Sequence, residues 1–169
     1  ILGRGDTFYG INEIKDWTLE TVNQLNETKV KQLFQKATLH DTVISVHLFL
    51  FNYFQYKADD LTQQLRSPSC SWQQRHTGID CKSYSIVASA LLLKLNIKHY
   101  FRKIKQPHSD NPNKYTHIYV IVPTDQNTAS KQSYFVVDGT LATMSEPNHS
   151  KSHDIFMDKL NYVGLNGSG

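Results

Sequence analysis

Cys81 has the surroundings that a nucleophilic cysteine needs. It directly follows Asp80, a residue type that caps helix N-termini well, and it precedes a small, leucine-rich run at 83–93. In the first turn of a helix, a side chain faces unpaired backbone N–H groups and the positive end of the helix dipole, which stabilise a thiolate over a thiol. Because the thiolate is the attacking species, this position predicts covalent catalysis by Cys81. A free Asp80 carboxylate would oppose this, but as a cap its charge is bound by amide groups.

A cysteine nucleophile also needs a base and a group that orients the base, and His117 and Asp138 are the candidates. A hairpin centred between residues 127 and 128 would place them side by side on neighbouring strands. An aspartate that accepts from one imidazole nitrogen would leave the other nitrogen facing the thiol. The sequence therefore predicts a triad of these three residues. Taken alone, each has a more ordinary interpretation: a structural cysteine, a surface histidine and a turn aspartate.

The elements that must position the triad are helices first. Apolar spacing predicts a helix from Thr18, as its N-cap, to about residue 37, with a break near 26–28. Asp41 is predicted to cap a second helix at 42–54, which is apolar all round and therefore expected to be buried. Residues 56–76 are predicted to form a loop. A helix from Cys81 to about residue 95 is the predicted centre of the fold.

Strands follow the helices. Residues 98–105, 116–122 and 133–138 alternate and are rich in β-branched or aromatic residues. In the second strand, alternation places His117 with Tyr119 on one face and Ile118 with Val120 against the helices. This order predicts an α+β fold with an antiparallel sheet. The length of 169 residues fits one domain. We divide it into a helical part at 1–55, a catalytic core at 72–141 and a C-terminal extension at 142–169.

Three motifs in this order resemble the transglutaminase-like superfamily of cysteine peptidases, which shares a papain-like core. They are the stretches 78–84 (GIDCKSY), 115–120 (YTHIYV) and 137–140 (VDGT). The resemblance implies that Cys81 is the nucleophile, His117 the base and Asp138 the orienting acid. It also implies that an upstream amide or aromatic side chain binds the oxyanion with the Cys81 N–H. The candidates are Trp72, Gln73 and Gln74. Flanking stretches at 9–11, 56–59 and 164–167 are similar to those of transglutaminase-like domains carried by bacteriophage virion proteins.

The expected function is a thiol hydrolase, a cysteine peptidase that acts on a polypeptide through an acyl-enzyme thioester. Processing or maturation of a longer polypeptide, or of a virion assembly that contains the chain, is the expected setting. Two alternatives stay open. The same acyl-enzyme could pass its acyl group to an amine, as a transglutaminase does. The chain could also be a non-enzymatic virion or structural module that retains the fold.

Composition excludes other classes. Two cysteines, Cys70 and Cys81, cannot make a disulfide-rich scaffold, and Cys70 is expected to be an inert free thiol. A net charge of +3 is too weak to indicate a nucleic-acid partner. The most apolar run, 42–54, is shorter than a membrane span, so no membrane is expected and localisation stays open. No cofactor or metal is expected either. His149, His153 and Asp154 have metal-like spacing, but their Ser-, Asn- and Pro-rich segment favours a solvated loop.

Overall fold

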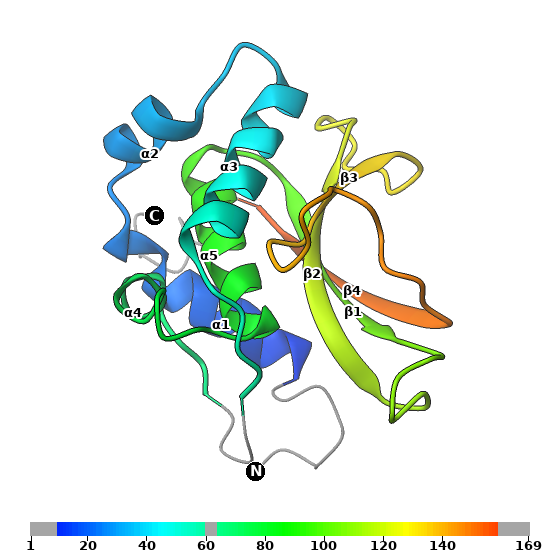
Figure 1. Cartoon of the computed structure of the whole chain (residues 1–169). Coiled ribbons are helices and arrows are strands. Elements are labelled where there is room, and N and C mark those ends of the chain that lie inside the picture. Colours follow the sequence, from blue (N-terminus) through cyan, green and yellow to red (C-terminus); the bar gives the residue numbers. More distant parts are fainter. Residues whose placement is uncertain (1–9, 60–63, 159–169) are drawn as a thin grey trace.

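The computed structural model describes residues 10–59 and 64–158, so Tyr9 and the flank at 164–167 lie outside the described part. Helices gather on one face of a four-stranded antiparallel sheet (Figure 1). The predicted α+β class is therefore confirmed. The main apolar core joins Ile14 from the first helix, Leu92 from the last helix and Met157 from the last strand. The division of the chain into three parts stays a prediction.

Helix α5 (Cys81–Lys94) packs on strand β2 and is also contacted by the other four α-helices. Every one of its residues is buried. Asp80 caps it, because its side chain accepts from the backbone N–H of Ser83. Small residues such as Ala88 and Ser89 let this helix approach its neighbours closely. The predicted central helix is confirmed in position and length.

The N-terminal region contains more helices than predicted: α1 (Ile11–Thr21), the 3-10 turn η1 (Val22–Gln24), α2 (Glu27–Phe34) and α3 (Leu39–Tyr53). The break predicted near 26–28 is present, and Asn26 caps α2. Thr18 is not a cap. It lies inside α1, where its hydroxyl donates to the Ile14 carbonyl at 2.8 Å. Asp41 is not the cap of α3 either, since the Thr38 hydroxyl accepts from the Asp41 N–H three residues on.

Helix α3 is buried on one side only. Val43, Val46 and Leu50 lie in the core, whereas Leu48 and Phe51 are 46% and 41% exposed. The loop predicted at 56–76 is also wrong in part, because α4 (Pro68–Gln73) lies within it. Ser67 caps this helix and Pro68 occupies its first turn, which is a typical helix start. Six residues are too few to show an apolar period.

The sheet has the strand order β3-β2-β1-β4, from β1 (His99–Lys105), β2 (Tyr115–Pro123), β3 (Tyr134–Val137) and β4 (Lys151–Met157). The first three strands confirm the predicted strands within one to two residues. Strand β4 is not among the predicted strands, and the solvated loop predicted around His149, His153 and Asp154 is wrong for residues 151–157. Strand β4 pairs with β1 from His99↔Met157 to Lys105↔Lys151. Its side chains are mostly polar and show no strand pattern, so the strand is defined by its pairing with β1.

The two faces of β2 meet different surroundings. Ile118, Val120 and Val122 join the main core beside the helices, as alternation predicted. Tyr119 and Ile121 belong to a second, smaller cluster. None of the helices in the described part of the chain is long and apolar enough to cross a membrane.

Candidate active site

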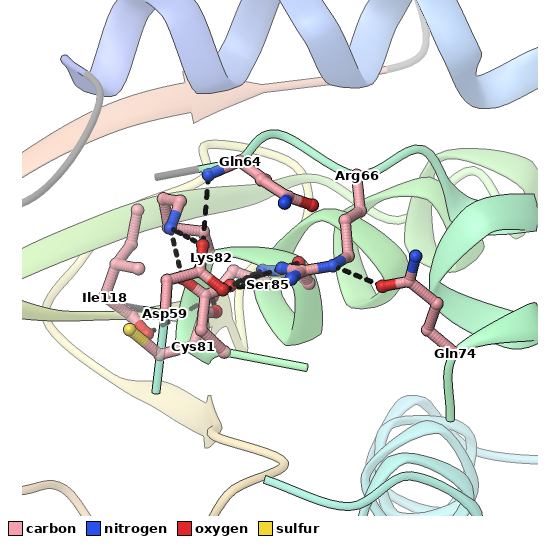
Figure 2. Close-up of polar contacts among 10 residues, drawn as sticks. Asp59, Gln64, Arg66, Gln74, Cys81, Lys82, Ser85 and Ile118 are labelled. Carbon is pink, nitrogen blue, oxygen red and sulfur yellow. Dashed lines mark hydrogen bonds and ion pairs between the residues drawn. The ribbon is translucent and has the colours of Figure 1, made fainter. Parts of the chain in front are cut away.

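Cys81 is the first residue of α5 and is 2% exposed. The Asp80 cap accepts at Oδ1 from both the N–H and the hydroxyl of Ser83, at 3.2 and 3.1 Å. One turn on, the Ser85 hydroxyl lies 2.9 Å from the Cys81 carbonyl and 3.2 Å from the Ile118 carbonyl (Figure 2). Ser85 therefore ties the turn that carries the thiol to the strand that carries His117.

His117 and Asp138 are in direct contact, as the sequence predicted. Nε2 of His117 lies 2.5 Å from Oδ2 of Asp138. The other carboxylate oxygen, Oδ1, accepts from the Thr140 N–H at 3.1 Å and from its hydroxyl at 2.6 Å. Burial would raise the pKa of Asp138, but its bonds with His117 and Thr140 outweigh burial and lower it. Asp138 is thus held as a carboxylate whose two oxygens have separate partners.

The predicted side-by-side register of His117 and Asp138 is wrong. Val120 pairs with Val137, so Asp138 follows the end of β3 and lies diagonally from His117. On the other side, Ile104 pairs with His117 but Lys105 pairs with Tyr115, which leaves one extra residue in β2 immediately before His117. Such bulges bend a strand and redirect its side chains. A long β2–β3 connection and this irregularity together set the geometry.

His117 also interacts with Cys81. Burial of the imidazole would lower its pKa. Hydrogen bonds with Asp138 and Cys81, together with the negative charges of both, outweigh burial and raise the pKa of His117 to about 10. Because Nε2 faces Asp138, Nδ1 is the nitrogen left for the thiol. The three predicted residues therefore form one connected group, with the imidazole in the middle.

Tyr56 belongs to the same site, although in the sequence it stands out only as part of the flanking stretch 56–59. Burial and the negative charges of Cys81, Asp80 and Asp138 raise the pKa of Tyr56 to about 12. Its hydroxyl therefore keeps its proton near neutral pH and can donate a hydrogen bond. The Tyr56 ring stacks on Tyr84, with centroids 6.4 Å apart.

Backbone pairing that no local sequence pattern predicts holds the segment around Tyr56. Tyr56 forms an isolated parallel bridge with Ile79, two residues before Cys81. Lys57 N–H donates to the Ile79 carbonyl at 2.9 Å, and Ile79 N–H donates to the Gln55 carbonyl at 2.8 Å. The sequence signal for Tyr56 is only that an aromatic residue follows a predicted helix. That signal does not predict a bridge to a residue more than 20 positions away.

Gly139 shows how tightly the acid is packed. A Cβ at this position would lie 2.6 Å from Cβ of Leu50 and 2.8 Å from Cδ1 of Tyr84. Only glycine lets the chain pass this close to α3 and α5. Asp138 is therefore positioned by packing of the following residue as well as by its hydrogen bonds.

The predicted oxyanion candidates have other contacts. The side-chain amide oxygen of Gln74, Oε1, accepts from Nε of Arg66 at 2.8 Å. The Trp72 ring stacks on Phe49 at 5.7 Å and lies under the Arg75 guanidinium at 3.9 Å. Gln73 ends α4 and is exposed. The oxyanion roles of Trp72 and Gln74 stay predictions.

The two cysteines are not bonded to each other. Both are free thiols, and Cys70 is partly buried in α4. In the residues that the structure describes, no group of three or more His, Cys, Asp or Glu side chains could hold a metal ion. The Asp154 carboxylate binds Arg102 instead. His149 contacts the Pro147 carbonyl through Nδ1, at 3.0 Å.

Comparison with known proteins supports the fold. No protein-family model matches the chain, and no curated protein matches it. Among solved structures, it is similar to "a Putative Cysteine Protease from Cytophaga hutchinsonii", with a TM-score of 0.51 and 14% sequence identity. The match covers 86% of this chain and 56% of that chain, so this chain spans little more than half of that protein. At such low identity the likeness shows a shared, cysteine-protease-like fold.

Proposed function

We propose that the protein is a thiol hydrolase, a cysteine peptidase of the transglutaminase-like type, with Cys81 as nucleophile, His117 as base and Asp138 as orienting acid. The observation that carries the proposal is the imidazole of His117, whose Nε2 lies 2.5 Å from Oδ2 of Asp138 and whose pKa is raised by interaction with both Asp138 and Cys81. A histidine with a purely structural role would not need a buried carboxylate partner together with a neighbouring thiol. A fold shared with a protein named as a cysteine protease agrees with this assignment.

The reaction follows from this arrangement. The Cys81 thiolate attacks the carbonyl carbon of a peptide and forms a tetrahedral oxyanion. The C–N bond then breaks, and the proton held by His117 passes to the leaving amine, which leaves a thioester on Cys81. Water, deprotonated by His117, attacks the thioester and releases a carboxylic acid and the thiol. Asp138 orients the imidazole and stabilises the imidazolium at each stage in which His117 carries the proton.

The Cys81 N–H and the Tyr56 hydroxyl are the oxyanion donors in this proposal. The first N–H groups of a helix have no intrahelical partner. The Tyr56 backbone pairs with Ile79, two residues before Cys81, and the raised pKa of the phenol keeps it protonated. We prefer it to Trp72 and Gln74, whose described contacts lie with Phe49, Arg75 and Arg66.

The test compares the two free thiols in one molecule. With iodoacetamide near neutral pH, mass spectrometry of the two cysteine peptides should show Cys81 alkylated at least about 10-fold faster than Cys70. A Cys70→Ser variant should keep the fast reaction, and His117→Gln should remove it. Equal rates at Cys70 and Cys81 would overturn the proposal and favour the non-enzymatic virion or structural module.

The acyl acceptor and the setting are finer parts of the proposal. Release of nitrophenolate from p-nitrophenyl acetate reports acylation of Cys81. An added fluorescent amine then distinguishes transfer of an acyl group to an amine from transfer to water. Incorporation of the amine into protein would favour acyl transfer, whereas steady release of acetate supports hydrolysis. If the protein processes a longer polypeptide or a virion assembly, the uncut precursor should persist when Cys81 is replaced by alanine.

A further inference from the structure

Four charged side chains meet at the start of α5, and we call Asp59, Arg66, Asp80 and Lys82 the helix-start network. Nζ of Lys82 donates to Oδ2 of Asp59 at 3.1 Å and also contacts Oδ2 of Asp80. Nη2 of Arg66 donates to Oδ1 of Asp59 at 3.0 Å, and Nη1 lies 3.5 Å from Oδ1 of Asp80. Figure 2 shows these contacts converging next to Cys81.

All members of this network are buried. Their side chains are 0% exposed for Lys82, 3% for Asp80, 5% for Asp59 and 10% for Arg66. Two cations balance two carboxylates, but removing each ion from water costs several kcal/mol. Replacing such a network with apolar residues is often neutral or stabilising. Its place therefore calls for a reason beyond stability.

The network connects two segments that meet at the reacting thiol. Lys82 directly follows Cys81, and Asp59 lies three residues after Tyr56. The same segment is pressed against residue 78, because a Cβ on Gly78 would lie 2.5 Å from Cβ of Lys57. Gly78 has φ +116°, a conformation that other residues rarely adopt. Backbone pairing fixes one end of the segment, and the Asp59 ion pairs fix the other.

We propose that Lys82 is a positioning residue for Tyr56: by holding Asp59 on the first turn of α5, it sets the place of the Tyr56 hydroxyl beside Cys81. This inference rests on the proposed function and deepens it, because it assigns the helix-start network to stabilisation of the oxyanion. Lys82 touches no reacting atom in this role. It acts through Asp59 and Tyr56.

Two reagents separate this role from a general loss of structure. Acylation by p-nitrophenyl acetate passes through an oxyanion, whereas alkylation by iodoacetamide does not. Both rates are measured at a pH where they no longer change with pH, so the protonation of Cys81 does not enter. Lys82→Met should slow acylation by about 10-fold or more, toward the effect of losing an oxyanion donor, while alkylation changes by less than about 3-fold.

A double-mutant cycle tests the route through Tyr56. Tyr56→Phe should slow acylation in the wild-type background and have little further effect in the Lys82→Met background. The inference would be overturned if the two substitutions slowed acylation by independent factors that multiply in the double variant. It would also be overturned if Lys82→Met slowed acylation and alkylation equally. Fast alkylation of Cys81 in the same samples would leave the proposed function standing, so the two failures are distinguishable.

The matched control is Lys94→Met. Lys94 is the last residue of the same helix, is 7% exposed, and donates to Asn23 at 3.0 Å. This variant should leave the ratio of acylation to alkylation unchanged. If Lys82→Met does not fold, Arg66→Gln removes the other cation on Asp59 from a less buried position, and it should shift the ratio in the same direction.

Discussion

Two ionic networks lie on different parts of the molecule, and they differ in what they join. The helix-start network links a loop to the turn that carries Cys81. The second, which we call the outer-sheet network, consists of Arg102, Tyr119, Tyr134, Glu146 and Asp154. Arg102 on β1 makes two bonds of 2.8 Å to Asp154 on β4 and one of 2.8 Å to Glu146.

The outer-sheet network is built to hold the fold together. Bonds to Asp154 and Glu146 raise the pKa of Arg102. Burial would raise the pKa of both carboxyls, but the Arg102 and Lys131 bonds outweigh it at Asp154, and the Tyr119, Tyr134 and Arg102 bonds outweigh it at Glu146, so both are lowered. Tyr119 adds a bond of 2.6 Å to Glu146, and Tyr134 donates to the same side chain. This network fastens the edge strand β4 and the residue 146 loop to the sheet. The outer-sheet network connects strands, whereas the helix-start network is proposed to position the Tyr56 hydroxyl at the Cys81 thiol.

His117 lies between these two systems, and its replacement should have the largest effect. Its imidazole bonds Asp138, and its ring lies 5.8 Å from that of Tyr119. His117→Gln should slow acylation of Cys81 by about 10²–10⁴-fold, because the proton acceptor is lost. Glu146→Gln, which alters the outer-sheet network behind Tyr119, should change the rate by less than about 3-fold. A large loss in Glu146→Gln would erase the distinction between the networks.

Arg102→Met should show the reverse pattern. It removes the cation that Asp154 and Glu146 share and leaves Asp154 with only the exposed Lys131, so the free energy of unfolding should fall by about 3–5 kcal/mol in urea denaturation. The acylation rate of the folded fraction should stay within about 2-fold of wild type. Lys131, which is exposed and also bonds Asp154, is a milder comparison. Its replacement by methionine should cost less than about 1 kcal/mol. An Arg102 variant that folds well but fails to acylate would contradict the assignment.

Gly139→Ala tests whether the position of Asp138 depends on packing as well as on its hydrogen bonds. The added methyl would meet Leu50 and Tyr84, so the chain must shift, at a cost of about 1–3 kcal/mol in unfolding free energy. A shift of Asp138 should also slow acylation, as small misplacements do. Gly10→Ala is the control, since its nearest atom would be at an ordinary 3.5 Å. Wild-type acylation in Gly139→Ala would show that Asp138 tolerates displacement.

The pH dependence of stability compares the folded protein with and without the His117 imidazole. The pKa of His117 is raised to about 10 in the folded protein, so its stabilising contribution is complete below about 6.5 and lost as pH rises through about 10. The melting temperature of wild type minus that of His117→Gln should therefore shrink across this window, by about 2–4 °C for each kcal/mol lost. A difference that grows with pH would contradict a paired imidazolium.

Local signals were strong enough to predict part of the site. The Asp80 cap, the small-residue helix after it and the alternation around His117 are short-range patterns, and all three appear in the structure. The weaker predictions failed where several residue types compete for one role. Thr38 rather than Asp41 caps α3, and α4 is too short for its period to show. Strand β4 failed because polar side chains on an edge strand look like a loop.

The sequence by itself determined which residue types stand at the start of the central helix and on the strands, because caps and alternation act over a few residues. Only the tertiary structure decided the diagonal contact of His117 with Asp138, the bridge that brings Tyr56 to residue 79, and the meeting of Asp59 with Lys82. These depend on the register of a long hairpin and on contacts between segments far apart in the chain. Forming these contacts costs loop-closure entropy, which burial of the shared core offsets, and no window of neighbouring residues contains that information.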